Sequence, residues 1–318
     1  MDTKDLLGFV FGMLSGVGFG LFMVPRKHSN LDNSQFPFSM GIGVLIGTSV
    51  FGLFAGKILP EPTLDYALSL LAGAFWGIGT IGFMYGVHYL GLARSAPIKN
   101  THAVLGTIFG VVIFHEFAFS HPIPLTLVLL GSAFMFVSAY SMGKMSSVHG
   151  SNSAHSGKYD PRTERRLTIL GVAWSIGSAV GYSAYTIPMK IVFAHGMSPL
   201  AFLAFMGHGC FLSMAVLFVL SGGNIRNWWQ QSWQDQAWAI AGGIMWSIAS
   251  AFSYTSIKMI GLAVSWPLVN LNTLVAAAYG IRIFKEIDLS LNRTAIICGI
   301  LSAVLGVIFL ALALSGKI

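Results

Sequence analysis

Long apolar runs are the feature that most constrains this chain. The first, Leu6 to Val24, contains no charged residue and matches the ~20 residues that a helix needs to cross a bilayer. Runs of similar length follow at short intervals along the 318 residues. Soluble domains carry about 25% charged residues, whereas this chain carries 9%. So few charges cannot cover a water-exposed surface, which excludes a soluble protein and predicts a multi-pass protein of the lipid bilayer.

The same runs predict ten membrane-spanning helices. They are continuous rather than alternating, which favours helices over the strands of a barrel. The expected spans are residues 6–24, 36–58, 66–89, 95–115, 123–142, 167–188, 199–220, 236–257, 264–284 and 294–315. The predicted fold class is therefore an all-α membrane protein.

The second half of the chain repeats the first. The segment GLARSAPIKN at residues 91–100 returns as GLAVSWPLVN at residues 261–270. Further equivalent residues are Gly73, Trp76 and Ile78 with Gly243, Trp246 and Ile248, and Ser15, Gly18, Pro25 and Lys27 with Ser178, Gly181, Pro188 and Lys190. Similarity that extends over several helices in order indicates homologous units. We expect a five-helix unit at 1–142, a polar loop at 143–166 and a second five-helix unit at 167–318.

An odd number of spans in each unit has a topological consequence. The second unit enters the membrane from the opposite side, which predicts two inverted five-helix repeats, an arrangement typical of secondary transporters. With the N-terminus outside, 13 of the 18 Lys and Arg residues fall on the cytoplasmic side, as the positive-inside rule favours. We therefore expect both termini outside a bacterial inner (cell) membrane or a plasma membrane. The net charge of +7 is then a topology signal, and no nucleic-acid partner is expected.

The pattern Ser-x-Pro-x-x-Asn opens the fourth and the ninth predicted spans. Ser95 and Ser265 are expected to cap the two helix starts. Asn100 and Asn270 follow about one turn later. Each amide offers two donors and an acceptor, which suits a solute rich in hydroxyl groups. The equally weighted alternative is that these amides hydrogen-bond between helices.

Other polar side chains near these elements are candidates for a central cavity shared by both halves, because polar residues within a span tend to face a bundle interior. They are Lys99, His102, Asn272 and Thr273. For Lys99 the alternative is that the side chain reaches back to the membrane interface.

Aromatic side chains form a second group of candidates. Trp76 and Trp246 are repeat equivalents, and their flat faces suit the apolar face of a sugar ring or a nucleobase. The alternative for both is plain packing within the bundle. Further candidates for the cavity wall are Tyr85, Tyr182, Tyr185, Tyr254 and Trp266.

Proton coupling has few candidate residues. No Asp or Glu lies at the centre of a predicted span, although ion-driven transport commonly uses buried carboxylates. Coupling would then depend on His102, His208, Lys99 or Glu116, or be absent. Histidine is a candidate because it changes its charge near neutral pH. The sequence lacks H-E-x-x-H, G-x-S-x-G and metal-ligand spacing. We therefore expect no enzyme, no metal and no cofactor.

Three segments carry a resemblance to a known family: GAFWGIG at residues 73–79, GLARSAPI at 91–98 and GVVIFHE at 110–116. With them the chain resembles the drug/metabolite transporter superfamily, whose members have ten helices in two inverted five-helix repeats. Within it the chain is similar to the glucose/ribose uptake (sugar transporter) family and to the related rhamnose–proton symporters. The resemblance implies a secondary transporter that moves a small polar solute, most simply a monosaccharide, by alternating access, with the proton as candidate coupling ion.

Two departures from that family bear on the solute. Its members often carry an amide after the Trp-x-Ile-Gly run, where this chain has Thr80, and Thr80 is therefore a candidate binding residue. A run of small residues is expected where this chain has Lys99, Asn100, Thr101 and His102. A cation near the site points to an anionic or more complex solute.

Two other functions stay open at this point. One is export or import of another metabolite, such as a nucleobase, a nucleoside, an amino acid or a sugar conjugate. The other is a non-transporting membrane receptor or assembly subunit. A polar central cavity shared by both halves would favour transport, whereas a dry, packed centre would favour the structural role. The oligomeric state is left open.

Overall fold

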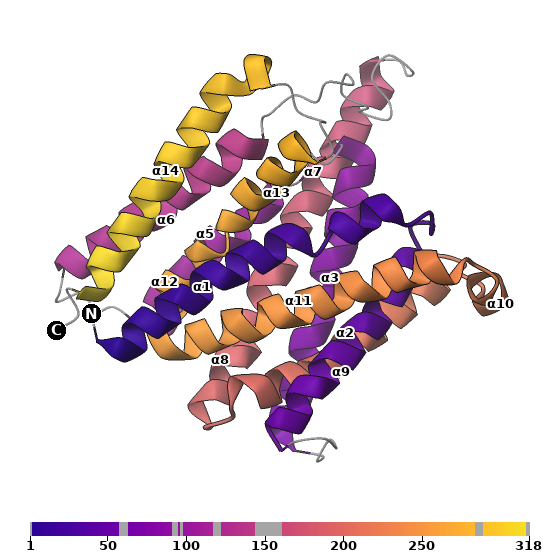
Figure 1. Ribbon diagram of the computed structural model, residues 1–318, viewed down its shortest axis with the longest axis horizontal. Helices are drawn as coiled ribbons and strands as arrows, with labels where there is room; N and C mark the ends of the chain where they lie inside the picture. The colour runs from indigo at the N-terminus through magenta and orange to yellow at the C-terminus, as the bar shows by residue number, and fades with distance from the viewer. Residues whose placement is uncertain are drawn as a thin grey trace.

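The computed structural model describes residues 2–56, 63–90, 95, 98–116, 122–143, 161–283 and 289–315, and these residues form helices joined by turns, without strands. In chain order the helices are α1 (Thr3–Leu21), the 3-10 helix η1 (Val24–His28), α2 (Gln35–Phe54), α3 (Leu64–Leu90), α5 (His102–Ile108), the π-helical turn η2 (Phe109–Ile113), α6 (Pro122–Gly143), α7 (Pro161–Ala184), α8 (Thr186–Ala194), α9 (Pro199–Leu220), α10 (Ile225–Trp229), α11 (Trp233–Ile260), α12 (Leu262–Leu268), α13 (Leu271–Arg282) and α14 (Leu289–Ser315). The long helices pack into one bundle, and α1 begins at the same end of it at which α14 finishes (Figure 1).

Seven helices in the described ranges are long and apolar enough to cross a membrane. These segments are Thr3–Arg26, Gln35–Phe54, Leu64–Gly86, Pro122–Met142, Arg165–Ala194, Pro199–Leu220 and Leu291–Ser315. Two shorter apolar helices cover Ile98–Ile113 and Leu262–Ala276. The expectation of an all-helical membrane protein is confirmed.

α11 has the length to span a membrane although it is not one of the seven. Serine recurs at every third position along its second half, at the buried residues Ser247, Ser250, Ser253 and Ser256. These hydroxyl groups lower the mean hydropathy of the helix. Ser247 donates to the carbonyl of Gly243, one turn earlier, at 3.0 Å, and Ser213 of α9 donates to the carbonyl of Gly209 at 2.8 Å. The Ser247 and Ser213 hydroxyls therefore each have an acceptor within their own helix.

The ninth predicted span is interrupted. The prediction of a single helix over 264–284 is wrong, because α12 ends at Leu268 and α13 begins only at Leu271. Pro267 lies inside α12, where it lacks an N–H donor and its ring crowds the carbonyl four residues earlier. Two residues further on, the Val269 N–H donates to the Trp266 carbonyl at 3.1 Å. The chain therefore tightens into a 3-10 turn between the two helices.

The capping role expected for Ser265 is also wrong. Gly261, with φ of 87°, stands at the N-cap of α12, and Ser265 lies within that helix. Its hydroxyl donates to the Ser256 hydroxyl on α11 at 2.7 Å. Ser265 thus connects two helices of the second half instead of starting one.

The described part of the fourth predicted span comprises Ser95 and the apolar helix Ile98–Ile113. Its last turn, η2, is π-helical. Beyond it His115 has φ of 49°, and the Glu116 N–H donates to the Gly110 carbonyl at 3.0 Å. This turn brings the chain back on itself and places the Glu116 carboxylate beside α12.

α7 begins at Pro161, inside the polar loop expected at 143–166. Proline fits the first turn of a helix because its missing N–H has no helical partner there. Residues 144–160 of that loop lie outside the described residues.

Helix packing follows the same plan in both halves. Extensive contacts join α3 with α7 and α9, and α11 with α1 and α2. Small residues make these contacts close: a Cβ atom added to Gly181 would lie 2.7 Å from the Gly79 nitrogen, and one added to Gly18 would lie 2.7 Å from the Ala249 Cβ. Gly18 is the sequence equivalent of Gly181. Each α3 contact therefore has an α11 counterpart.

Candidate solute-binding site

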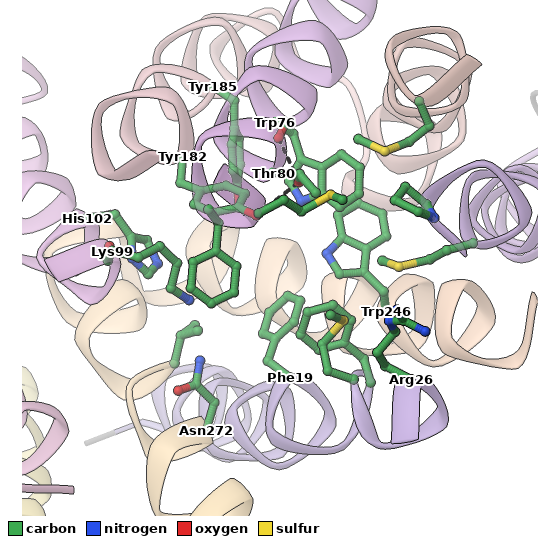
Figure 2. Close-up of a pocket in the computed structure, with 18 of the residues that line it drawn as sticks. Phe19, Arg26, Trp76, Thr80, Lys99, His102, Tyr182, Tyr185, Trp246 and Asn272 are labelled. Atoms are coloured by element: carbon green, nitrogen blue, oxygen red, sulfur yellow. Dashed lines mark hydrogen bonds between the residues drawn. The ribbon is translucent and has the colours of Figure 1, made fainter. Parts of the chain in front are cut away.

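A cavity of about 360 Å³ lies at the centre of the bundle (Figure 2). This volume lies within the ~300–1,000 Å³ usual for small-molecule sites. The polar side chains that line it are Arg26, Asn33, Thr80, Lys99, His102, Tyr182, Tyr185 and Asn272, and the indoles are Trp76, Trp246 and Trp266. Both halves of the chain contribute, since the wall includes residues of α1, α2, α3 and α5 and of α7, α9, α11, α12 and α13.

Two tryptophans form one wall of the cavity. Trp76 of α3 and Trp246 of α11 have ring centroids 4.7 Å apart, and their planes are inclined by 52°. Both side chains are buried, and Figure 2 shows them side by side at the edge of the space. The paired rings present a broad aromatic surface with N–H groups at its rim, which suits a flat polar solute.

Thr80 and Tyr182 make a hydrogen-bonded pair across the two halves. The Thr80 hydroxyl donates to the Trp76 carbonyl at 3.0 Å and lies 2.9 Å from the Tyr182 hydroxyl. Because Thr80 donates its single hydroxyl proton to the Trp76 carbonyl, the Tyr182 hydroxyl is the donor between Tyr182 and Thr80. The phenol oxygen keeps its acceptor capacity on the cavity side. Thr80 therefore acts mainly by orienting Tyr182.

Lys99, His102 and Asn272 gather at the opposite wall. The Lys99 ammonium lies 5.3 Å from the ring centroid of Phe83 and 5.7 Å from that of Tyr182. Figure 2 shows Lys99 extending into the cavity and the Asn272 amide approaching from α13. The His102 Nδ1 donates to the Lys99 carbonyl at 2.9 Å, since a carbonyl only accepts. Its Nε2 is then free to serve as an acceptor.

One end of the cavity reaches the chain segment between α1 and α2. There the Arg26 guanidinium donates to the Ser29 carbonyl at 3.1 Å and to the Asn33 side chain at 3.3 Å. Burial of the nearby Asp32 raises its pKa, but hydrogen bonds from Gln35 and Ser34 and the charge of Arg26 outweigh burial and hold that pKa below its usual value. Asp32 is therefore an anion that balances Arg26 at this open end.

At the other end of the bundle, Glu116 joins the turn after η2 to α8 and α12. Its carboxylate accepts hydrogen bonds from the backbone N–H groups of Leu262 and Ala263, each at 2.7 Å. It also pairs with the Lys190 ammonium of α8 at 2.6 Å. The Glu116 side chain is 7% exposed and that of Lys190 is 21% exposed. We call this group of contacts, Glu116 with Lys190, Leu262 and Ala263, the closed end.

Six of the predicted binding residues meet in the cavity: Trp76, Thr80, Lys99, His102, Trp246 and Asn272. Asn100 and Asn270 do not line it; they are buried, and the Asn100 side-chain oxygen and both polar atoms of the Asn270 amide have no hydrogen-bond partner. Thr273 is also outside the lining, because its hydroxyl donates to the Asn270 carbonyl at 2.8 Å.

The proton-coupling candidates other than Lys99 fall in three different places. His102 lines the cavity. His208 on α9 lies beside Tyr66, with ring centroids 6.1 Å apart, and is not part of the lining. Glu116 belongs to the closed end. Only His102 among the three therefore meets the solute space.

Sequence reasoning missed Phe19, Phe83 and Arg26, which also line the cavity. A signal for Phe19 was present in the repeat, because Phe19 is the equivalent of Tyr182 at the spacing that pairs Gly18 with Gly181. Phe83 and Arg26 have no comparable signal in the repeat.

A helical membrane bundle with a small cavity between its halves, lined by aromatic and apolar side chains and a few polar groups, has the architecture of a membrane solute carrier. The family model described as "Sugar transport protein" matches residues 10–313. The chain therefore belongs to the sugar transport protein family, and the resemblance found in the sequence is confirmed.

Relatives match the chain over most of its length. The glucose uptake protein GlcU of Bacillus subtilis is 23% identical over 282 residues, which cover 87% of this chain and 90% of the relative. A Bacillus cereus protein described as "Probable glucose uptake protein GlcU" is 25% identical over 284 residues, with 88% and 91% covered. A solved crystal structure aligns with a TM-score of 0.66 over 94% of this chain and 96% of its own. At 11% identity this likeness shows the fold alone.

Proposed function

We propose that the protein is a secondary transporter that carries a monosaccharide across the membrane by alternating access. The observation that carries the proposal is the central cavity, open towards the α1–α2 connection and closed at Glu116. A transporter must expose its site to one side at a time, and a cavity with one open end and one closed end has this property.

Ten spans in two inverted five-helix units, 1–142 and 167–318, joined at 143–166, form the framework of this proposal. Matched contacts in the two halves support it. α3 packs against α7 and α9, and its repeat equivalent α11 packs against α1 and α2, the equivalents of α7 and α9. Units built alike and placed upside down can exchange conformations, which converts one open end into the other.

Orientation follows from the basic residues. With both termini outside, Arg26 and the open end face the cytoplasm, and the closed end faces the outside. The conformation described above is then the inward-open one. Solute released from it enters the cell, which agrees with uptake as the transport direction.

The cavity wall offers the groups that a sugar needs. Hydroxyl groups would meet the Asn272 amide, the Tyr182 phenol oxygen and the His102 Nε2, which together provide donors and acceptors. The apolar face of the ring would lie on the Trp76 and Trp246 surface. Asn100, Asn270 and Thr273 have no direct part in this arrangement.

Uptake by liposomes containing the purified full chain tests the proposal. Labelled pentoses and hexoses are offered at equal concentration, with nucleosides and amino acids in parallel. Entry of at least one sugar well above empty liposomes is the expected result. Entry of nucleosides or amino acids without entry of any sugar would refute the sugar proposal.

Trp76→Ala is expected to raise the sugar concentration for half-maximal uptake at least tenfold. Truncating an aromatic residue at the centre of a binding site costs ~2 kcal/mol or more, and 1.4 kcal/mol corresponds to about tenfold in affinity. Trp246→Ala is expected to act similarly. Trp229→Ala is the matched control, since that side chain is 77% exposed. If the Trp76 and Trp229 variants needed the same sugar concentration for half-maximal uptake, the tryptophan pair would not be part of the binding site.

We further propose that the proton is the coupling ion and that His102 carries it. An imposed pH gradient of one unit, acid outside the vesicle, is expected to drive sugar accumulation up to about tenfold for one proton per sugar. His102→Gln should still equilibrate sugar but lose this accumulation, whereas His208→Gln should keep it. Accumulation that ignores the gradient in the unchanged protein would exclude proton coupling.

A further inference from the structure

Lys99 is the most unusual group in the cavity. Its ammonium lies over the rings of Phe83 and Tyr182 at 5.3 and 5.7 Å from their centroids. No carboxylate within the described ranges forms an ion pair with it, and the described cavity wall contains neither Asp nor Glu. A cation held by two aromatic faces keeps its donors available, because ring faces accept charge but not three separate N–H bonds.

The other cations near the site are already engaged. Arg26 donates to Ser29 and Asn33, and its guanidinium carbon lies 4.9 Å from the Phe36 centroid. Asp32 balances its charge. Lys190 is paired with Glu116 at the closed end. Lys99 therefore contributes to the cavity wall one positive charge that no described protein group neutralises.

We propose that the transported sugar is a monosaccharide carboxylate, such as a hexuronate, and that Lys99 binds its carboxylate. This inference rests on the proposed function and specifies its solute. A charge taken out of water needs a partner of opposite sign, and the solute is the partner that the cavity lacks. Bound solute would complete the ion pair, so an occupied cavity is electrostatically more favourable than an empty one.

A carboxylate fits this site better than a phosphate does. One ammonium matches a single negative charge, whereas a phosphate monoester carries about −1.5 to −2 at neutral pH. The remaining polar groups, Asn272, Tyr182 and His102, are neutral hydrogen-bonding partners suited to hydroxyl groups. The sugar ring would lie between Lys99 on one wall and the tryptophan pair on the other.

The first test compares substrates in liposomes that contain the unchanged full chain. Labelled glucuronate, galacturonate, glucose and glucose 6-phosphate are offered separately at one low concentration. A uronate is expected to enter at least about tenfold faster than glucose, the factor typical of a hydrogen bond to a charged group. Faster glucose entry would overturn this inference and leave the proposed function standing. Preference for glucose 6-phosphate would also overturn it, and entry of no sugar at all would remove the proposed function itself.

The second test removes the charge. Lys99→Gln is expected to reduce uronate uptake about 10- to 100-fold, while uptake of glucose stays within about threefold. Lys4→Gln is the matched control, because Lys4 is an exposed residue near the N-terminus and its loss changes the net charge equally. A Lys99 variant that lowers both sugars equally, or neither, would overturn the assignment. Thermal unfolding in detergent checks that each variant is folded.

Discussion

Glu116→Leu is expected to reduce sugar uptake by about 100-fold or more. The Glu116 carboxylate holds three partners from two different elements: the Lys190 ammonium at 2.6 Å and the N–H groups of Leu262 and Ala263 at 2.7 Å. Removing one member of a largely buried ion pair costs ~3–5 kcal/mol, and each 1.4 kcal/mol corresponds to about tenfold in population. The conformation with the closed end intact would then be scarcely populated, and the transport cycle could not be completed.

Two measurements separate this effect from misfolding. A cysteine introduced by Val269→Cys in the cavity wall should react faster with a membrane-impermeant thiol reagent added from the Glu116 side once Glu116 is replaced. Lys190→Gln should have a smaller effect, because Glu116 keeps its two backbone bonds. The double variant should be no worse than Glu116→Leu, since the two residues act through one interaction. Unchanged uptake and unchanged labelling would show that Glu116 does not hold this end closed.

Gly73→Ala and Gly243→Ala are each expected to lower the stability of the fold by about 1–3 kcal/mol, the usual cost of overpacking. A Cβ atom at Gly73 would lie 2.5 Å from the Met206 carbonyl oxygen and 2.6 Å from the Cys210 nitrogen. At Gly243 it would meet the Met40 carbonyl oxygen and lie 2.6 Å from the Val44 nitrogen. Backbone atoms cannot turn aside as a flexible side chain can, so the helices would have to separate.

Gly177→Ala is the matched control for these glycines. It lies on α7 with nothing within 4 Å of an added Cβ, and alanine is a better helix former than glycine by ~1 kcal/mol. This variant should unfold at the same temperature as the unchanged protein or at a slightly higher one. The Gly73→Ala and Gly243→Ala variants should unfold at a lower temperature and give less folded protein. Equal unfolding temperatures for all three would mean that the α3–α9 and α2–α11 contacts are looser than described.

The positions of the spans were predictable from the sequence because a helix in lipid requires a long apolar run, which is visible in the sequence. The apolar run expected at 199–220 is α9, Pro199–Leu220, and the run expected at 123–142 differs by one residue at each end from α6, Pro122–Gly143. A helix in hydrocarbon satisfies its own backbone and needs an apolar surface along its length. Both requirements are local and can be read without knowing the neighbours.

The site was predictable only in part, because it depends on the direction in which each side chain points. Trp76, Trp246 and Lys99 were identified from the repeat and from their unusual chemistry. Asn270 was expected to bind solute, but Pro267 breaks the helix just before it, and the tighter turn leaves the amide buried away from the cavity. A proline inside an apolar run can kink a helix or start one, and tertiary packing decides between the two.

The closed end was not predictable at all. Glu116 and Leu262 are 146 residues apart in the chain, and their contact depends on a π-helical turn and a residue with positive φ. Neither feature follows from an apolar pattern. Interactions between segments that far apart arise only when the bundle is assembled.

The serine hydroxyls of the central helices have a consequence for the speed of transport. Ser247 and Ser213 donate within their own helices, to Gly243 and Gly209 one turn earlier, and each lies against a glycine of the neighbouring helix, Gly47 or Gly77. The same hydroxyls also lie within longer hydrogen-bond distance of a carbonyl on the neighbouring helix, 3.3 Å from Val44 for Ser247 and 3.4 Å from Gly73 for Ser213. When one helix slides past the next, each hydroxyl can keep the shorter bond within its own helix and lose only the longer one. The activation barrier between conformations then reflects shape more than broken bonds, and the ion pair at Glu116 becomes the principal resistance to reorientation.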